Sequence, residues 1–227
     1  MRVKNNLDTI IYDYIISSLI MGEYHMGQII SLDDLSQKYE VSRTPVTQAV
    51  KLLVKDGILE MQKNGRVKVP EMTKNDLRQI CEIRLVLEEY AFKKVFLLMD
   101  EHEDAYFENL EKLAEADMKA AAANDTLQFN RYDMEFHRAL ISGARNVYLE
   151  TEYKEIQGKF LVANYLLDSI EGRIRDVERA AKEHVAIVEA IKAKDINQCM
   201  AFIRKHVFPF EMELNEDILV QKYHYVK

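Results

Sequence analysis

Hydrophobic residues at the start of the chain are spaced three and four apart, as on one face of an amphipathic helix. This spacing predicts a first helix that begins near Leu7 and ends at Gly22. Ser31 followed by Asp34 has the spacing of a helix N-cap with a carboxylate in the first turn, and it predicts a short second helix through Tyr39. The chain is therefore expected to begin with two helices separated by a short connection.

A third helix and a β-hairpin are predicted next. Ser42 is expected to cap the helix, which accepts Pro45 in its first turn and ends at Gly57. Beyond it, an Asn-Gly pair, which is a strong hairpin signal, separates two short runs with β-strand character, Ile58–Met61 and Arg66–Val69. Three short helices followed by a hairpin are the element order of a winged helix-turn-helix.

The remainder of the chain is predicted to be helical almost throughout. Pro70 marks the expected boundary between a winged helix-turn-helix domain (residues 1–70, the reading head) and an all-helical domain (residues 71–227, the sensor). The sensor's apolar positions predict helices over residues 76–98, 102–123, 126–142, 147–168, 173–193 and 196–214. We therefore expect a mainly α protein whose sensor is a bundle of six or seven helices.

Two residues are expected to affect where the last predicted helix begins and where it bends or ends. Asp195 stands where an N-cap is expected, and Pro209 falls inside the helical pattern, where it should kink or end the helix. The whole chain holds only 7 Gly and 3 Pro. Such a shortage of turn residues argues against a β-sandwich or a series of β-α-β units.

Charge is divided unevenly between the two predicted domains. The formal net charge of −7 would by itself argue against binding to a polyanion. Residues 1–70, however, hold nine basic and eight acidic side chains, a net charge of +1, and residues 71–227 hold 22 and 30, a net charge of −8. The acidity thus belongs to the sensor, and the reading head remains able to bind DNA.

No targeting or membrane segment is apparent. The N-terminal residues contain no apolar run long enough for a signal peptide, and no apolar stretch reaches the roughly 20 residues needed to span a bilayer. Cys81 and Cys199 fit no metal-binding or redox spacing and lie among apolar residues, so buried thiols are expected. These features predict a soluble, cytoplasmic protein without a membrane partner.

Short polar side chains open the third predicted helix, which in this architecture enters the major groove of DNA by its N-terminus. Arg43 is suited to guanine and Gln48 to adenine. Basic residues further along the helix and in the predicted hairpin of residues 58–69, the wing, are candidates for phosphate contacts. Each of them alone could also belong to an ordinary solvated face. The candidate DNA-binding residues are Ser42, Arg43, Thr44, Thr47, Gln48, Lys51, Lys63, Gly65 and Arg66.

Histidines in the sensor form a candidate metal site. Asp133 and His137 are four residues apart and share one helical face, while His184 and His206 each follow apolar residues at helical spacing and should face inward. One buried histidine is usually a hydrogen-bonded core residue. Three histidines and an aspartate that converge from three helices would suit Zn²⁺, Ni²⁺ or Mn²⁺.

Arg84 lies in the apolar stripe of the first sensor helix, four residues before Glu88. An inward arginine needs an anionic partner, which is either a carboxylate of the protein or the carboxylate of a bound effector. The spacing leaves both alternatives open. Arg173 and Arg175 are further candidates to reach the same pocket, and the sequence does not choose between them.

The motifs together resemble a known family. The segment Val41-Ser42-Arg43-Thr44-Pro45-Val46, with Asp56-Gly57-Ile58-Leu59 after it, is similar to the N-terminal domain of GntR-family transcriptional regulators, and the sensor resembles the FCD ligand-binding domain of the FadR subfamily. The resemblance implies a homodimer that binds a palindromic operator in double-stranded DNA and responds to a small organic acid. It covers nearly the whole chain.

The same resemblance implies roles for individual sensor residues. Metal-binding FCD domains carry D-x-x-x-H, then E-H, then a histidine in the last helix, which correspond here to the ligands Asp133, His137, His184 and His206. The family's R-x-x-x-E places Arg84 at the effector pocket. Asn146 corresponds to a turn asparagine with a structural role.

Two departures from the family pattern concern DNA recognition. Thr47-Gln48 stand where family members usually have Arg-Glu, and Asp33-Asp34 stand where the second helix often carries an arginine. The operator is therefore expected to differ from the family's common one.

The alternative function is a metal-dependent, hydrolase-like enzyme with an accessory winged helix. The sequence contains no HExxH motif, no glycine-rich phosphate loop and no nucleophile with a triad pattern. Glu135 should face away from Asp133 and His137, so no base is placed beside the metal. A regulator rather than an enzyme is the favoured interpretation.

Overall fold

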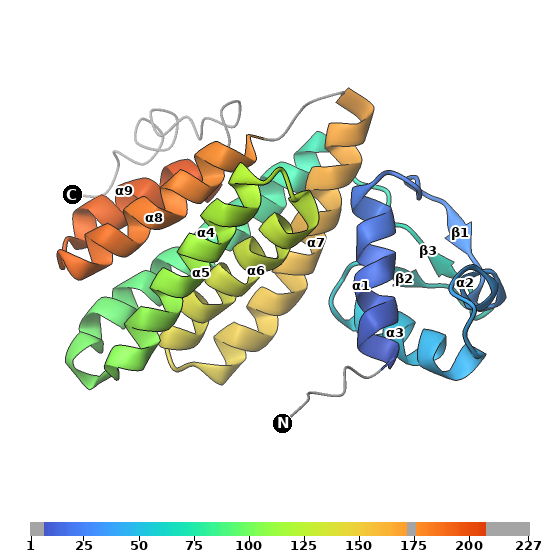
Figure 1. Ribbon diagram of the computed structural model, residues 1–227, viewed down its shortest axis with the longest axis horizontal. Helices are drawn as coiled ribbons and strands as arrows, with labels where there is room; N and C mark the ends of the chain where they lie inside the picture. The colour runs from blue at the N-terminus through green and yellow to red at the C-terminus, as the bar shows by residue number, and fades with distance from the viewer. Residues whose placement is uncertain (1–6, 172–175, 208–227) are drawn as a thin grey trace, which may run out of the picture.

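The computed structural model describes residues 7–171 and 176–207. Figure 1 shows a small N-terminal part, which contains a short β-sheet, beside a larger bundle of long helices, with α1 and α7 adjacent where the two parts meet. In the described part of the chain, no helix is long and apolar enough to cross a membrane.

The N-terminal part is the predicted winged helix-turn-helix. Its elements in chain order are α1 (Leu7–Ile20), β1 (Ile29–Ile30), α2 (Leu32–Lys38), α3 (Arg43–Lys55), β2 (Glu60–Met61) and β3 (Val67–Lys68). The strands form one antiparallel sheet in the order β1-β3-β2, in which Val67 pairs with Ile30 on one side and Met61 on the other. The strand β1 was not predicted, because two residues are too short for a periodic pattern.

Capping explains where α2 begins, and it corrects the expectation for α3. Ser31 and Asp34 form the predicted capping box, with each side chain bound to the other residue's backbone N–H. Ser42 occupies the N-cap position of α3 with extended backbone, but its side chain makes no capping hydrogen bond. The prediction that its hydroxyl caps the helix was therefore wrong, and this exposed hydroxyl stays available for other contacts.

The sensor is the expected helical bundle. Its helices are α4 (Lys74–Leu97), a 3-10 turn η1 (Met99–Glu101), α5 (Asp104–Ala122), α6 (Thr126–Gly143), α7 (Val147–Glu171), α8 (Val177–Lys192) and α9 (Ile196–Val207). Thr73 caps α4 with Asp76 in a second capping box, and Asp195 accepts a hydrogen bond from the N–H of Gln198 at the start of α9. Pro209 lies outside the described residues.

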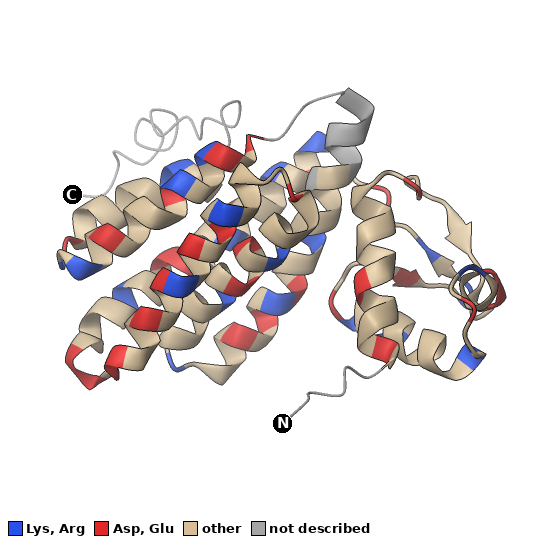
Figure 2. Ribbon diagram, viewed as in Figure 1, with Lys and Arg blue, Asp and Glu red and all other residues tan. Residues whose placement is uncertain are grey.

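The side chains that face inward form a continuous apolar core between α4, α5, α6, α7, α8 and α9. Cys81 and Cys199 are free and buried in this core, as predicted. Burial raises the pKa of the Cys81 thiol to about 11 and that of Cys199 to about 12. Figure 2 shows acidic and basic residues interspersed along the bundle helices, where several form ion pairs four residues apart.

Candidate functional site: a buried histidine cluster and an exposed recognition helix

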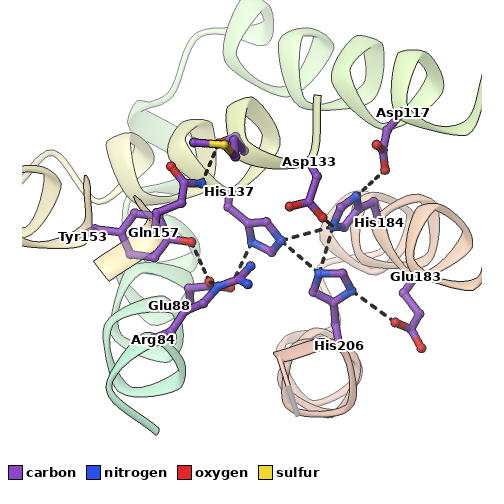
Figure 3. A network of polar contacts seen from close by, with 11 residues as sticks. Arg84, Glu88, Asp117, Asp133, His137, Tyr153, Gln157, Glu183, His184 and His206 are labelled. Carbon is purple, nitrogen blue, oxygen red and sulfur yellow. Dashed lines mark hydrogen bonds and ion pairs between the residues drawn. The ribbon is translucent and has the colours of Figure 1, made fainter. Parts of the chain in front are cut away.

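The four predicted metal ligands come together in the interior of the sensor. Asp133 and His137 project from α6, His184 from α8 and His206 from α9, and one ligand atom from each lies within 4.8 Å of all the others. The three Nε2 atoms of the histidines are 3.0, 3.1 and 3.2 Å apart (Figure 3). Oδ1 of Asp133 lies 3.8 Å from Nε2 of His184. The convergence that the spacing left open is present in the structure.

Each histidine of the cluster has a carboxylate behind it. Nδ1 of His184 lies 2.8 Å from Oδ2 of Asp117 on α5, Nδ1 of His206 lies 3.1 Å from Oε2 of Glu183, and Nδ1 of His137 lies 3.0 Å from Oε2 of Glu88 on α4. A carboxylate at Nδ1 favours the tautomer that carries its proton there and leaves the Nε2 lone pair free. All three lone pairs then point to one place.

This arrangement fits a bound cation. Three imidazole lone pairs about 3 Å apart repel one another unless a positive ion lies between them. Nitrogen ligands bound about 2.1 Å from one ion, at angles of roughly 90–100°, stand about 3.0–3.2 Å apart. Burial, followed by the neighbouring histidines, holds the pKa of His206 well below its usual value, so that its ring is neutral and able to coordinate.

Arg84 points inward, as its place in the apolar stripe predicted, and is only 2% exposed. Its Nε donates to Oε1 of Glu88 at 2.5 Å, and its guanidinium lies over the ring of Phe160, 4.2 Å from the centroid. The protein therefore supplies one anionic partner itself. Nη2 of Arg84 is buried and has no hydrogen-bond partner among the described residues.

Glu88 connects Arg84 to the histidine cluster. Besides Arg84 and His137 it contacts Tyr153 of α7, whose hydroxyl donates to Oε1 of Glu88 at 2.7 Å. Burial raises the pKa of Tyr153 well above its usual value, with the Arg84 charge opposing this shift and the Glu88 charge adding to it, so the hydroxyl remains a hydrogen-bond donor. The arginine, the carboxylate and the tyrosine form one buried polar group beside the cluster (Figure 3).

Other residues singled out in the sensor lie away from this cluster. Glu135 pairs with Arg131, 3.2 Å away, as its outward orientation predicted. Asn146 accepts hydrogen bonds from the N–H groups of Tyr148 and Leu149 at the start of α7, which is the structural role expected of it. Arg173 and Arg175 lie outside the described residues.

Glu88, Asp117 and Glu183 were not predicted as histidine partners. Glu183 adjoins His184 in the sequence, but the structure directs its carboxylate to His206. Asp117 comes from α5, and no spacing links it to His184. The one available signal was its acidic side chain on the apolar face of α5, where a buried charge needs a partner.

The candidate DNA-binding residues outside the wing lie on the outward face of α3 or at its N-cap. Ser42, Arg43, Thr44, Gln48 and Lys51 are all exposed. The Thr47 hydroxyl donates to the backbone oxygen of Arg43 at 2.8 Å and still has acceptor capacity. The opposite face of α3 is anchored by fully buried residues, Val46, Ala49, Val50 and Leu53. The structure thus places the polar face of α3 outward.

The wing carries the other candidates. Lys63, Gly65 and Arg66 are exposed in the turn between β2 and β3. Gly65 adopts a φ of +78°, a left-handed conformation that favours glycine, and Asn64 accepts a hydrogen bond from the N–H of Arg66. Nε of Arg43 lies 3.5 Å from Oδ1 of Asp33. One of the two aspartates that stand where the family often has an arginine is therefore paired with a side chain at the N-terminus of α3.

Comparison with known proteins finds a matching family model for each of the two parts of the chain. The model of the bacterial regulatory proteins of the gntR family matches residues 7–69, and the FCD domain model matches residues 79–208. The gluconate operon transcriptional repressors of Bacillus licheniformis and Bacillus subtilis (strain 168) are 26% and 25% identical over 181 residues. Both alignments cover 78% of this chain and 72% of the relative.

A solved structure shows the same fold. The E. coli protein McbR/YncC superposes with a TM-score of 0.69 at 21% identity, over 96% of this chain and 99% of that one. The family matches indicate a transcriptional regulator and not an enzyme, which removes the alternative of a metal-dependent hydrolase. The chain belongs to the gntR family of bacterial transcriptional regulators and carries an FCD domain.

Proposed function

We propose that the protein is a dimeric operator-binding regulator whose affinity for DNA responds to a small organic acid bound beside a metal ion in the sensor. The observation that carries the sensing role is the convergence of three histidine Nε2 atoms next to a buried arginine whose Nη2 is unpartnered among the described residues. The reading role is carried by the exposed polar face of α3 and its basic wing.

Asp133, His137, His184 and His206 would hold the ion, with Zn²⁺, Ni²⁺ and Mn²⁺ as candidates. The ion would supply a positive centre that attracts an anionic ligand into an otherwise acidic domain. Arg84 would position the ligand's carboxylate through Nη2, while Glu88 keeps the guanidinium oriented. Two relatives are named as gluconate operon repressors, which makes sugar acids the first effector class to test.

An exposed face of α4 supports a homodimer formed through the sensor. Ile83, Val86, Tyr90 and Leu97 lie on one side of this helix, opposite the buried side that carries Arg84 and Glu88, and their exposure ranges from 45 to 74%. An exposed stripe of large apolar side chains on one face of a helix is characteristic of an interaction surface. A second copy of the chain packed against it would place two reading heads on one operator, as palindromic sites require.

DNA binding is tested by selecting fragments from a random duplex pool with the full chain at moderate salt, followed by footprinting. A palindromic consensus with protection of both half-sites is expected. If the protein retains no sequence preference with or without added Zn²⁺, Ni²⁺ or Mn²⁺, the proposed reading role is wrong.

Metal binding is tested by elemental analysis of protein purified without chelators. About one transition-metal ion per chain is expected, and His137→Ala should lower both the metal content and the melting temperature. His102→Ala is the matched control, because His102 lies outside the cluster. Unchanged metal content in His137→Ala would contradict the ligand assignment.

The effector site is tested by thermal shift with D-gluconate and a panel of sugar acids and dicarboxylates. A ligand that raises the melting temperature of the wild type should lose this effect in Arg84→Met. The control is Arg78→Met, which removes an exposed arginine paired with Glu82 on the same helix. A response that survives in Arg84→Met would place the effector elsewhere.

A further inference from the structure

The C-terminal end of the recognition helix α3 is in direct contact with α7 of the sensor. The contact is made by the backbone: a Cβ added to Gly158 would lie 1.7 Å from the carbonyl oxygen of Asp56. Only a residue without a side chain allows the two backbones this close. Gly57 faces the same helix with a φ of +71°, and a Cβ there would lie 3.1 Å from the carbonyl oxygen of Glu155.

A buried carboxylate holds this contact together. Asp56 is 4% exposed; its Oδ2 accepts a hydrogen bond of 2.9 Å from the Tyr12 hydroxyl of α1, and its Oδ1 lies 3.0 Å from Nζ of Lys154 on α7. Burial, and after it the Asp56 charge, raises the pKa of Tyr12, so that its hydroxyl remains a donor. One side chain therefore ties α1, α3 and α7 together.

The same stretch of α7 is also fixed to the sensor. Tyr153, adjacent to Lys154, donates to Glu88, which in turn contacts His137 of the histidine cluster. Gln157, adjacent to Gly158, donates to the backbone oxygen of Met134 on α6 at 2.8 Å. The contact with the reading head therefore lies on a stretch of α7 whose adjacent residues are hydrogen-bonded to Glu88 and to the backbone of α6.

Beside this contact the two parts are less closely packed. A cavity of about 240 Å³ separates α1 from α6, with Tyr12, Ile16, Met134 and Arg138 in its walls. Val162 of α7 adds an apolar contact to the core of the reading head. The Asp56–Gly158 contact is thus a close backbone contact that lies next to a cavity.

We propose that the contact between Asp56, Tyr12, Lys154 and Gly158, the joint, fixes the direction of α3 relative to the sensor and so determines the half-site spacing that the dimer accepts. The proposal rests on the proposed dimeric, DNA-binding function. In a dimer held together by the sensors, the separation of the two recognition helices follows from the angle at each joint, and half-site spacing reflects that separation. These residues act through α3 and are positioning residues for recognition.

The test compares binding to the selected operator with binding to the same operator carrying one extra base pair between its half-sites. The wild type should bind the longer DNA at least about tenfold more weakly, because one half-site loses its base contacts. In the double variant Tyr12→Phe/Lys154→Met, and in Gly158→Ala, this penalty should fall to about threefold or less. A joint that served stability alone would lower the affinity for both DNAs by the same factor.

Matched controls come from the same helix. Glu152→Gln neutralises an exposed side chain outside the joint, and Thr151→Ala changes the helix propensity of α7 at another exposed position. Both should retain the wild-type spacing penalty. If the double variant also retains it, the joint does not determine spacing and the inference fails.

A second measurement tests the joint without DNA. Spin labels on Gln37→Cys in α2 and Lys119→Cys in α5, both exposed, report the distance between reading head and sensor when labelled chains are diluted with unlabelled protein. A narrow distance distribution in the wild type should broaden or shift in the joint variants. An unchanged distance distribution in the joint variants would overturn the proposal. If no operator is selected from the duplex pool, the proposed function fails instead, and the distance measurement still tests whether the joint fixes the direction of α3.

Discussion

Nδ1 of His137 lies 3.0 Å from Oε2 of Glu88, and both side chains are completely buried. Glu88 also accepts hydrogen bonds from Nε of Arg84 and from the hydroxyl of Tyr153. A single carboxylate on α4 therefore orients a candidate metal ligand on α6 and the candidate effector-binding arginine on its own helix. Loss of this carboxylate should affect both sites at once.

The first prediction concerns that carboxylate. Glu88→Gln removes the negative charge at Nδ1 of His137 and weakens the hold on its tautomer, so metal affinity should fall about 10–100-fold. Competition with a chromogenic chelator measures it. Glu82→Gln, on the same helix and paired with Arg78 near the surface, should leave the affinity unchanged. Equal affinities for wild type and Glu88→Gln would show that Glu88 does not support the metal.

The second prediction concerns pH. His206 has a pKa lowered by burial and by its histidine neighbours, whereas in the unfolded chain a histidine has a pKa of about 6.5. Below that pH the unfolded state takes up a proton that the folded state does not, so the metal-free protein should lose stability as pH falls through about 6.5. Urea denaturation at pH 8, 7, 6 and 5.5 measures the loss, which His206→Gln should reduce. A stability that rises as the pH falls over this range would contradict the buried, neutral assignment.

The third prediction separates base reading from phosphate binding. Gln48→Ala should weaken the selected operator by about 1–3 kcal/mol and leave non-specific binding nearly unchanged, since Gln48 is exposed on the reading face of α3. Lys63→Ala in the wing should weaken both and reduce the slope of log K against log salt by about 1. Titrations by fluorescence anisotropy at several salt concentrations distinguish the two patterns. If Gln48→Ala weakened all duplexes equally, Gln48 would not read a base.

The fourth prediction tests the dimer surface. Val86→Glu places a charge at the centre of the exposed apolar stripe on α4 and should convert the dimer to a monomer in sedimentation velocity runs, because a buried unpaired charge is strongly unfavourable. Met21→Glu, at an exposed apolar position in the reading head, is the control and should remain dimeric. A dimeric Val86→Glu would locate the interface on another face.

The fifth prediction concerns the thiols. Cys81 and Cys199 are buried, with pKa values raised to about 11 and about 12 by burial, so the thiolate that reacts with disulfide reagents is scarce. Neither thiol should react with Ellman's reagent at pH 8 in the native protein, and both should react promptly in urea. Rapid reaction in the native protein would mean that this core opens readily.

Most of the helices and strands, and the inward faces of individual helices, follow from local patterns in the sequence, although the two-residue strand β1 does not. Helical periodicity, the Ser31–Asp34 capping box and the Asn-Gly turn predicted the winged helix-turn-helix, and the four-residue spacing placed Asp133 and His137 on one side of α6. Local patterns suffice for this because hydrogen bonds and side-chain direction within a helix depend on near neighbours.

Which helix faces meet depends instead on how the helices pack in three dimensions. It brought His184 and His206 to Asp133 and His137, directed Glu183 to His206 instead of its neighbour His184, and packed Gly158 against Asp56. These pairs join residues far apart in the chain, and their contact depends on the angles and offsets at which helices pack, which a periodic pattern does not contain. The candidate metal ligands could therefore be predicted from the sequence. Their carboxylate partners and the contact between α3 and α7 could not, because they depend on how the helices pack.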